Sequence, residues 1–385
     1  MKRYDVIVIG GGPAGSFISK LLAGEGFSVL LVEKKRYPGE NIHCAEGLSS
    51  ASIEGILRIK DRWVSVELKG AEINSPSKGF TVLYPGVGWI LDRRIFDRDL
   101  FLGAVQSGAE CLTGVAANSI EEYSDGERVV RTTAGSFRSP LVVGADGVPG
   151  FVGRETGLLK PFTLKEFHQT YQCLAYTGID DQIAHFYVGR SIAPGGYAWV
   201  FPKGGGFSNV GIGIDRSLTR RSAKVYFEQF VKNYINSFRP ISCSGSAVPT
   251  TVNRRLVGEG VALVGDGGRL TDPFSGGGIA HALISSYMLY TKIKEHGICN
   301  RALKAYEKEW NRTYGRNNSW GWRAKMVLRE LDDDTIERIV EFGIKNYHRK
   351  VIDEIKVYDI IKSLIREYPD LMKPGLRLLR GRYDL

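Results

Sequence analysis

The sequence is poor in the residues that build metal sites and disulfide frameworks. Its 385 residues include five cysteines and six histidines. The cysteines stand far apart without a Cys-x-x-Cys pair, and the histidines show no His-Glu-x-x-His or similar spacing. We therefore expect no metal site and no disulfide framework.

Long apolar runs are also missing. No stretch reaches the ~18 residues of a membrane-spanning helix. Lys2 and Arg3 lead directly into a strand-like segment, unlike the start of a signal peptide. We expect a cytoplasmic chain, or one that lies at the inner face of the membrane without crossing it.

The positive charge is not arranged as in a nucleic-acid reader. The formal net charge is +10, but no Lys/Arg-rich run is interleaved with aromatic residues. Two interpretations stay open: a basic solvated surface, or attraction to anionic lipid or a phosphorylated substrate. We expect no nucleic-acid partner.

What the sequence does contain begins with residues 4–15, YDVIVIGGGPAG. The β-branched run at residues 6–9 is typical of a buried parallel strand. Glycines with the spacing G-x-G-x-x-G follow, and then helical spacing over residues 16–26. A second apolar strand at residues 28–32 ends at an acid, 18 positions after the last glycine of the motif. This order is the fingerprint of a dinucleotide-binding unit.

Each residue of the fingerprint has a physical role. Gly10 permits the tight turn, Gly12 lets the backbone approach a pyrophosphate, and Gly15 lets helix and strand pack closely. Glu33 can accept hydrogen bonds from ribose hydroxyls and would repel the 2′-phosphate of NADP. The alternative is a glycine-rich turn without a ligand.

Two further residues are expected near this unit. Pro38 and Gly39 predict a loop at residues 34–50, at the sheet edge where ligands bind, and Cys44 lies within it. Cys44 is either an ordinary loop cysteine or a functional thiol. Arg93 begins a predicted helix that ends near residue 108, and it either reaches a phosphate or ribityl chain or is simply exposed.

The remaining pattern alternates between two kinds of sheet. Residues 63–90 and 167–214 alternate with period two and predict antiparallel strands. Residues 109–120 predict one strand of the nucleotide sheet, followed by a strand pair around residues 124–126. Residues 141–144 predict a buried strand that ends near Asp146, whose carboxylate can accept hydrogen bonds from loop amides.

The segment from Pro194 to Pro202, PGGYAWVFP, stands out within the antiparallel part. Tyr197, Trp199 and Phe201 share one face of a predicted strand. Such a face is either core or the wall of a long apolar pocket.

A second phosphate-type site is predicted near the end of the nucleotide unit. A strand at residues 260–265 leads into Asp266, a glycine-rich turn and a helix at residues 279–293. Further helices are predicted at residues 220–238, from residue 300 onward, at 335–349 and at 354–368. Their tryptophans and basic residues fit either an interfacial surface or packing onto the body.

These motifs carry a resemblance to a known family. GGGPAG with Glu33, GADG at residues 144–147 and GDGGRLTDPFSGGGI at residues 265–279 resemble the FAD enzymes of the para-hydroxybenzoate hydroxylase superfamily. Gly267 and Gly268 stand where that superfamily usually has two alanines. The C-x-x-G loop at residues 44–47 and the complete P-x-x-Y-x-W-x-F-P segment are similar to the geranylgeranyl reductase family, and especially to its archaeal members, the digeranylgeranylglycerophospholipid reductases.

The resemblance implies an α/β (α+β overall) fold. A Rossmann-like FAD-binding domain, interleaved with an antiparallel-sheet substrate domain, would comprise residues 1–62, 91–165 and 255–300. The substrate domain would comprise residues 63–90 and 166–254, and a C-terminal helical region residues 301–385.

The resemblance also implies the site residues. Tyr197 and Trp199 would line a prenyl pocket, and Cys44 would lie near the flavin ring. FAD contacts would fall on Gly10, Gly12, Ala14, Gly15, Glu33, Cys44, Ala45, Gly47, Arg93, Ala117, Asp266, Gly278 and Ile279. The implied partners are a prenylated phospholipid, a membrane surface and an electron donor, either NAD(P)H or ferredoxin.

The expected chemistry is hydride transfer from reduced flavin to an alkene, with a proton added at the other carbon. Candidate proton donors are Cys44, Glu46, His43 or a water that they hold. Three alternatives stay open: a flavin monooxygenase, a quinone (menaquinone) side-chain reductase, and a non-catalytic prenyl-lipid binding protein with a relic flavin site.

Overall fold

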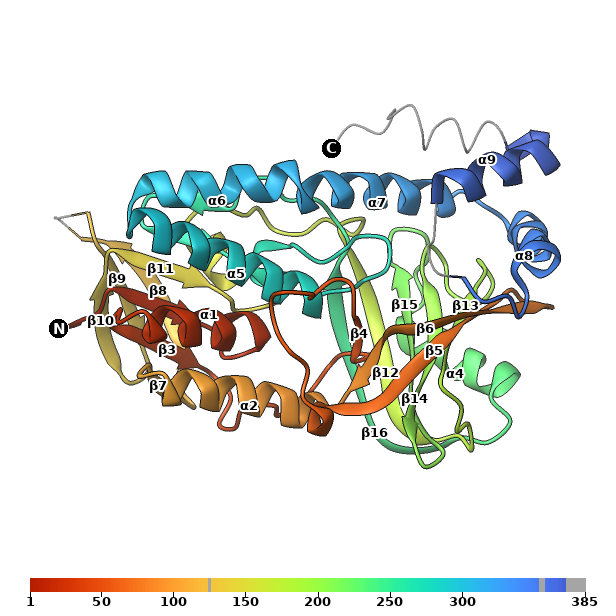
Figure 1. Cartoon of the computed structure of the whole chain (residues 1–385), viewed down its shortest axis with the longest axis horizontal. Helices are drawn as coiled ribbons and strands as arrows, with labels where there is room; N and C mark the ends of the chain where they lie inside the picture. The colour runs from red at the N-terminus through yellow and green to blue at the C-terminus, as the bar shows by residue number, and fades with distance from the viewer. Residues whose placement is uncertain (124–125, 353–356, 372–385) are drawn as a thin grey trace.

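The structure is a computed structural model that describes residues 1–123, 126–352 and 357–371. Two adjoining units are visible, one built on a six-stranded sheet and one on an eight-stranded sheet (Figure 1). Helices α6 (Asn300–Arg312) and α7 (Tyr314–Leu328) run along one side of both units. In the described residues no helix has both the length and the apolar character to span a bilayer.

The six-stranded sheet forms because its central strands are continuous apolar runs that can be buried on both faces. All four residues of β2 are buried, and so are all five of β3. Neighbouring strands are parallel except at the β17–β18 edge. In spatial order the strands are β17 (Val257–Gly258), β18 (Val261–Leu263), β11 (Leu141–Gly144), β2 (Val6–Ile9), β3 (Val29–Glu33) and β7 (Glu110–Thr113).

The two faces of this sheet are covered differently. Val6 and Val8 pack against α1 (Pro13–Gly24), α5 (Ile279–His296) and α6. Ile7 and Ile9 pack toward a four-stranded sheet on the other side. That sheet consists of β1 (Lys2–Arg3), β10 (Gly135–Ser139), β9 (Arg128–Thr132) and β8 (Ala117–Glu122).

The prediction of one strand over residues 109–120 was wrong. Gly114 has φ +69° and ends β7 in the six-stranded sheet, and β8 then begins in the four-stranded sheet. The turn is held because the N–H of Gly114 donates to the carbonyl of Lys35 at 2.9 Å. β8 and β9 form the predicted antiparallel pair, but residues 124 and 125 of the expected turn lie outside the described residues.

The eight-stranded sheet confirms the antiparallel prediction, with one parallel junction between β13 and β5. The strands after residue 214 include β16, which periodicity did not predict. In spatial order the strands of the eight-stranded sheet are β16 (Arg239–Pro249), β12 (Phe167–Tyr176), β15 (Phe207–Asp215), β14 (Tyr197–Gly204), β13 (Ile183–Val188), β5 (Val64–Asn74), β6 (Gly79–Leu91) and β4 (Gly47–Ser49).

Of the other helices, α2 packs against α1. One face of the eight-stranded sheet is covered by α4, through Phe227 and Phe230. The start of the last predicted helix, residues 354–356, lies outside the described residues. The bounds are α2 (Arg93–Gln106), α3 (Phe151–Glu155), α4 (Ala223–Tyr234), α8 (Asp333–Tyr347) and α9 (Val357–Glu367).

Key aromatic and basic residues of α6 and α7 pack onto the body of the protein. Trp310 is fully buried, and Lys325 is only 3% exposed. The guanidinium of Arg329, the residue directly after α7, pairs with the fully buried Asp215 at 2.6 Å. For these side chains the packing interpretation therefore holds, rather than the interfacial one.

The expectation of no disulfide was wrong. Cys173 on β12 and Cys243 on β16 are directly opposite each other and form a disulfide. They are 70 residues apart in the sequence, so only the register of the two strands makes them neighbours. Cys44, Cys111 and Cys299 are free.

We therefore predict three titratable thiols in protein purified and denatured without reductant, and five after reduction. The physical reason is that only the Cys173–Cys243 pair is close enough to bond. A thiol-specific chromophore with peptide mapping measures this. Five thiols before reduction would contradict the pairing.

Candidate active site

The first glycine turn is built by close backbone contacts. A Cβ on Gly10, which has φ +103°, would lie 2.4 Å from the carbonyl oxygen of Ala145. A Cβ on Gly15 would lie 1.8 Å from the carbonyl oxygen of Gly10. Only glycine fits at both positions, so the turn and the start of α1 are held tightly together.

Gly12 differs from its two neighbours in the motif. It caps α1 with φ −74°, and a Cβ placed there would meet nothing within 4 Å. The protein itself therefore does not require glycine at this position. Open space beside a helix N-terminus is where a pyrophosphate needs to approach the backbone.

Glu33 lies at the end of β3, against this turn. Its carboxylate accepts hydrogen bonds from the N–H of Gly11 at 2.5 Å and of Lys35 at 2.7 Å. Each carboxylate oxygen has further acceptor capacity, which leaves room for ribose hydroxyls. The N–H of Val115 donates to the carbonyl of Glu33 at 3.0 Å, and this brings the start of β8 at Ala117 close to the same place.

The second glycine turn faces the first. A Cβ on Gly265 would lie 3.2 Å from Cβ of Ala14, and Ser286 of α5 donates to the carbonyl of Ala14 at 3.0 Å. Asp146 lies between the turns and accepts from the N–H of Phe151, as predicted. Burial raises the pKa of Asp146 to about 6.

Asp266 occupies the second turn beside the N-terminus of α5. Its carboxylate accepts from the hydroxyl of Thr271 at 2.6 Å, and a Cβ on Gly278 would lie 3.0 Å from it. Burial raises the pKa of Asp266, while Thr271 and the charge of Arg93 oppose this effect. Ile279, the first residue of α5, is buried in the same apolar cluster that Cys44 contacts.

Arg93 and Cys44 are brought together by the start of α2. The guanidinium of Arg93 makes a two-point contact with Asp97, at 3.0 and 2.7 Å. Burial raises the pKa of the Cys44 thiol above its usual range, although the nearby Arg93 opposes this. The thiol is therefore protonated near neutral pH.

The three candidate proton donors are in different situations. Both carboxylate oxygens of Glu46 accept hydrogen bonds, from the N–H of Arg93 at 2.9 Å and from Nζ of Lys203 at 2.8 Å. His43 is exposed to solvent. Only Cys44 combines a half-buried, protonated group with apolar neighbours.

The aromatic residues of β14 form a wall beside this loop. Tyr197, Trp199 and Phe201 lie in one cluster with Phe186, and Ala45 packs against it. The ring of Phe186 is 5.6 Å from that of Tyr197 and 5.2 Å from that of Phe201. The predicted shared face is confirmed, and Ala45 brings the Cys44 loop against it.

Two residues that the sequence analysis missed join the wall to the loop. Asn209 donates to the carbonyl oxygen of Cys44 at 2.9 Å and accepts from the indole N–H of Trp199 at 3.1 Å. Gln172 donates to the same carbonyl at 3.1 Å. Both lie in ordinary alternating strands, so no local signal marks them.

An apolar pocket of about 530 Å³ opens next to the loop. Several of its lining residues, including Leu57, Ile59 and Trp89, pack in the same cluster as Cys44. The pocket and Cys44 thus share one apolar cluster. Its lining is Ser50, Ala51, Ile53, Glu54, Leu57, Arg58, Ile59 and Trp89.

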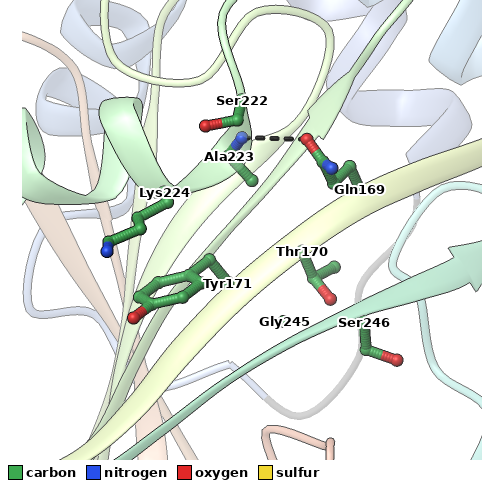
Figure 2. A pocket seen from close by; sticks show the side chains of 8 residues that line it. All are labelled: Gln169, Thr170, Tyr171, Ser222, Ala223, Lys224, Gly245 and Ser246. Carbon is green, nitrogen blue, oxygen red and sulfur yellow. Dashed lines mark hydrogen bonds between the residues drawn. The ribbon is translucent and has the colours of Figure 1, made fainter.

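A second, polar pocket of about 290 Å³ lies on the face of the eight-stranded sheet that α4 covers (Figure 2). Gln169 accepts from the N–H of Ala223 at 3.0 Å, and the ring of Tyr171 packs on Phe227. Gln172 points to Cys44, and Gln169 and Tyr171 point the opposite way because strand residues alternate. This pocket is thus not part of the Cys44 site.

Comparisons with known proteins agree with this geometry. Residues 166–248 match the family model described as the geranylgeranyl reductase catalytic domain, and residues 3–62 match an FAD binding domain. A curated digeranylgeranylglycerophospholipid reductase of Methanosarcina acetivorans is 33% identical over 96% of this chain and 94% of its own length. The chain belongs to the geranylgeranyl reductase family.

Other geranylgeranyl reductase relatives give the same result. A digeranylgeranylglycerophospholipid reductase of Methanospirillum hungatei is 34% identical, over 98% of this chain and 99% of its own. The crystal structure of a geranylgeranyl bacteriochlorophyll reductase-like protein from Thermoplasma acidophilum has a TM-score of 0.89 and 30% identity. It covers 98% of this chain and 100% of that one. The predicted family, fold class and FAD cofactor are confirmed.

The residues present fit FAD. The space beside Gly12 suits a pyrophosphate, and the carboxylates of Glu33 and Asp266 suit hydroxyl groups. The buried guanidinium of Arg93 supplies a positive charge between the loop and the second turn.

We predict that Gly12→Ala weakens FAD binding without unfolding the protein. The methyl group meets no protein atom, but it fills the space that the pyrophosphate needs. Overpacking typically costs about 1–3 kcal/mol, which is about 5- to 150-fold in Kd. Flavin fluorescence titration measures Kd, and circular dichroism checks the fold.

Gly24→Ala is the matched control, since this glycine ends the same helix and also has nothing within 4 Å of a Cβ. Unchanged FAD affinity in Gly12→Ala would show that the ligand does not approach the helix there.

Proposed function

We propose that this chain is an FAD-dependent reductase that saturates C=C bonds in the geranylgeranyl chains of a digeranylgeranylglycerophospholipid. The observation that carries the proposal is the placement of the half-buried Cys44 thiol. The thiol has apolar surroundings. It lies between the part of the molecule that contains the two glycine turns and the aromatic wall of β14. The names of the relatives at 33% and 34% identity support the same substrate.

FAD would be held by the two glycine turns and the loop between the sheets. We assign Glu33 to the adenosine ribose, with backbone contacts near Ala117 to the adenine. When bound and reduced, FAD supplies a hydride at N5. The assigned contacts are Gly10, Gly12, Ala14, Gly15, Glu33, Cys44, Ala45, Gly47, Arg93, Ala117, Asp266, Gly278 and Ile279.

The chain's own part in the reaction is to hold a proton and exclude water. An isolated alkene is not polarised by a neighbouring group, so one carbon must be protonated as the other is reduced. The Cys44 thiol is assigned as proton donor, because burial keeps it protonated. Tyr197 and Trp199 line the prenyl chain, and their rings favour positive charge that develops on carbon.

The substrate proposal includes the membrane. The net charge of +10 favours approach to anionic lipid and to the phosphate of the substrate. The apolar pocket beside Leu57 and Trp89, in the cluster that Cys44 also contacts, offers space for a lipid chain. The electron donor is assigned only as NAD(P)H or ferredoxin.

The two sheets also support a division into domains. FAD binding is assigned to residues 1–62, 91–165 and 255–300, and substrate binding to residues 63–90 and 166–254. Residues 301–385 are assigned to a helical region, of which residues 353–356 and 372–385 lie outside the described part.

We predict that the dithionite-reduced protein, under anaerobic conditions, adds hydrogen in pairs to digeranylgeranylglyceryl phosphate. Mass spectrometry of the lipid in steps of two hydrogens measures this, together with reoxidation of the flavin absorbance. A yellow protein that leaves the lipid unchanged would remove the substrate assignment and keep the fold.

We predict that Cys44→Ala lowers the rate of prenyl reduction by about 10²–10⁴-fold, the usual contribution of a positioned acid. FAD affinity changes little, because the carbonyl and not the thiol holds the loop in place. Cys111→Ala is the control, since this half-buried thiol lies on β7, where its Sγ donates to the carbonyl of Ala109. Equal losses of both properties in Cys44→Ala, or no loss, would reject the role.

A further inference from the structure

Glu46 has an unusual backbone conformation for its residue type. Its φ is +68°, in the left-handed region, and it is the third residue of the Cys44–Gly47 motif. A non-glycine residue persists in this region only where its surroundings hold it there. The contacts of Glu46 therefore indicate what the loop depends on.

Three contacts hold Glu46 in place. Its carbonyl accepts from the N–H of Leu91 at 2.9 Å. One carboxylate oxygen accepts from the N–H of Arg93 at 2.9 Å, and the other from Nζ of Lys203 at 2.8 Å. The side chains of Glu46 and Lys203 are each only 10% exposed, so water competes weakly for this ion pair.

The held conformation acts directly on Cys44. The N–H of Glu46 donates to Sγ of Cys44 at 3.2 Å. The same carboxylate binds the N–H of Arg93, whose guanidinium is the positive charge nearest to the thiol. The Glu46–Lys203 ion pair thus holds in place both the Glu46 N–H that donates to the thiol and the Arg93 guanidinium that faces it.

Lys203 also belongs to the substrate side of the molecule. It lies on β14 two residues after Phe201, where the register of β14 with β15 is irregular. Its ammonium group also donates to the carbonyl of Leu91 at the end of β6. Lys203 therefore connects β14, which carries the aromatic wall, to the loop that carries Cys44.

We propose that Lys203 is a positioning residue for Cys44. By holding Glu46 in place, Lys203 orients the Cys44 thiol toward the space between the flavin site and the aromatic wall. The proposal rests on the proposed function only in giving Cys44 its task. Lys203 acts on the thiol through Glu46, by keeping Glu46 in its left-handed turn.

Several groups face the thiol, and the test accounts for each of them. They come from α2, the loop that carries Cys44, and β14. They are Arg93 with its partner Asp97, Glu46 with its partner Lys203, and Tyr197. Loss of the Glu46 N–H and relaxation of Arg93 both destabilise the thiolate, so both raise the pKa of Cys44.

The experiment measures Cys44 itself in the full-length protein, first without FAD and then loaded with it. The pH dependence of iodoacetamide alkylation is followed by peptide mass spectrometry, with the exposed Cys299 as the internal reference. The variants are Lys203→Met, Lys203→Arg and Glu46→Gln. Lys292→Met is the control. Lys292 lies on α5 and pairs with Glu309 at 3.0 Å, and it is far in the sequence from the loop that carries Cys44.

In Lys203→Met we expect the alkylation midpoint of Cys44 to rise by about one pH unit, with Cys299 unchanged. With the reduced, FAD-loaded enzyme and lipid, kcat falls by about a hundredfold, the scale of a misplacement of about 1 Å, while KM changes little. Lys203→Arg restores much of both properties because it keeps the charge. Glu46→Gln also loses the ion pair with Lys203, but it removes a negative charge that itself raises the pKa of Cys44, so its midpoint rises by less than in Lys203→Met.

An unchanged Cys44 midpoint in folded Lys203→Met or folded Glu46→Gln would overturn the proposal. So would an equal shift in Lys292→Met. If Lys203→Met does not fold, Glu46→Gln decides by the same criterion. If the wild-type protein does not reduce the lipid, the proposed function fails, yet the alkylation of FAD-free protein still decides whether Lys203 aims Cys44.

Discussion

The hydrogen bonds to the carbonyl oxygen of Cys44 connect the nucleotide-binding unit to the eight-stranded sheet. Gln172 of β12 and Asn209 of β15 both donate to it, at 3.1 and 2.9 Å. The loop that carries this carbonyl leaves β3 at Glu33 and ends in β4 of the other sheet. Because different sheets hold its two ends, the thiol keeps its position relative to both the flavin site and the aromatic wall.

The charges around these hydrogen bonds are paired within the protein. Arg93 pairs with Asp97, and Lys203 pairs with Glu46, all with little exposure to water. Breaking a buried pair by removing one partner typically costs about 3–5 kcal/mol. The pairs therefore suit a site that must stay dry around an alkene, since they satisfy their charges without water.

Much of the site was predictable because its signals are local. The turn at Gly10 and Gly15 depends on neighbouring residues, and the shared face of Tyr197 and Trp199 follows from strand alternation. The single strand expected over residues 109–120 was wrong because one turn, at Gly114, moves the chain to another sheet. Hydropathy does not mark this change of sheet, because neither β7 (ECLT) nor β8 (ANSIEE) is a continuous apolar run.

By itself, the sequence determined the dinucleotide unit, the antiparallel sheet and the residue types of the site, because period-two alternation, glycine spacing and helix periodicity act between near neighbours. Only the tertiary structure decided which distant residues meet. The disulfide of Cys173 with Cys243, the hydrogen bonds of Asn209 to Cys44 and the pairing of Lys203 with Glu46 all join separate segments. Their physical reason is strand register and the packing of one sheet against another, which no local pattern specifies.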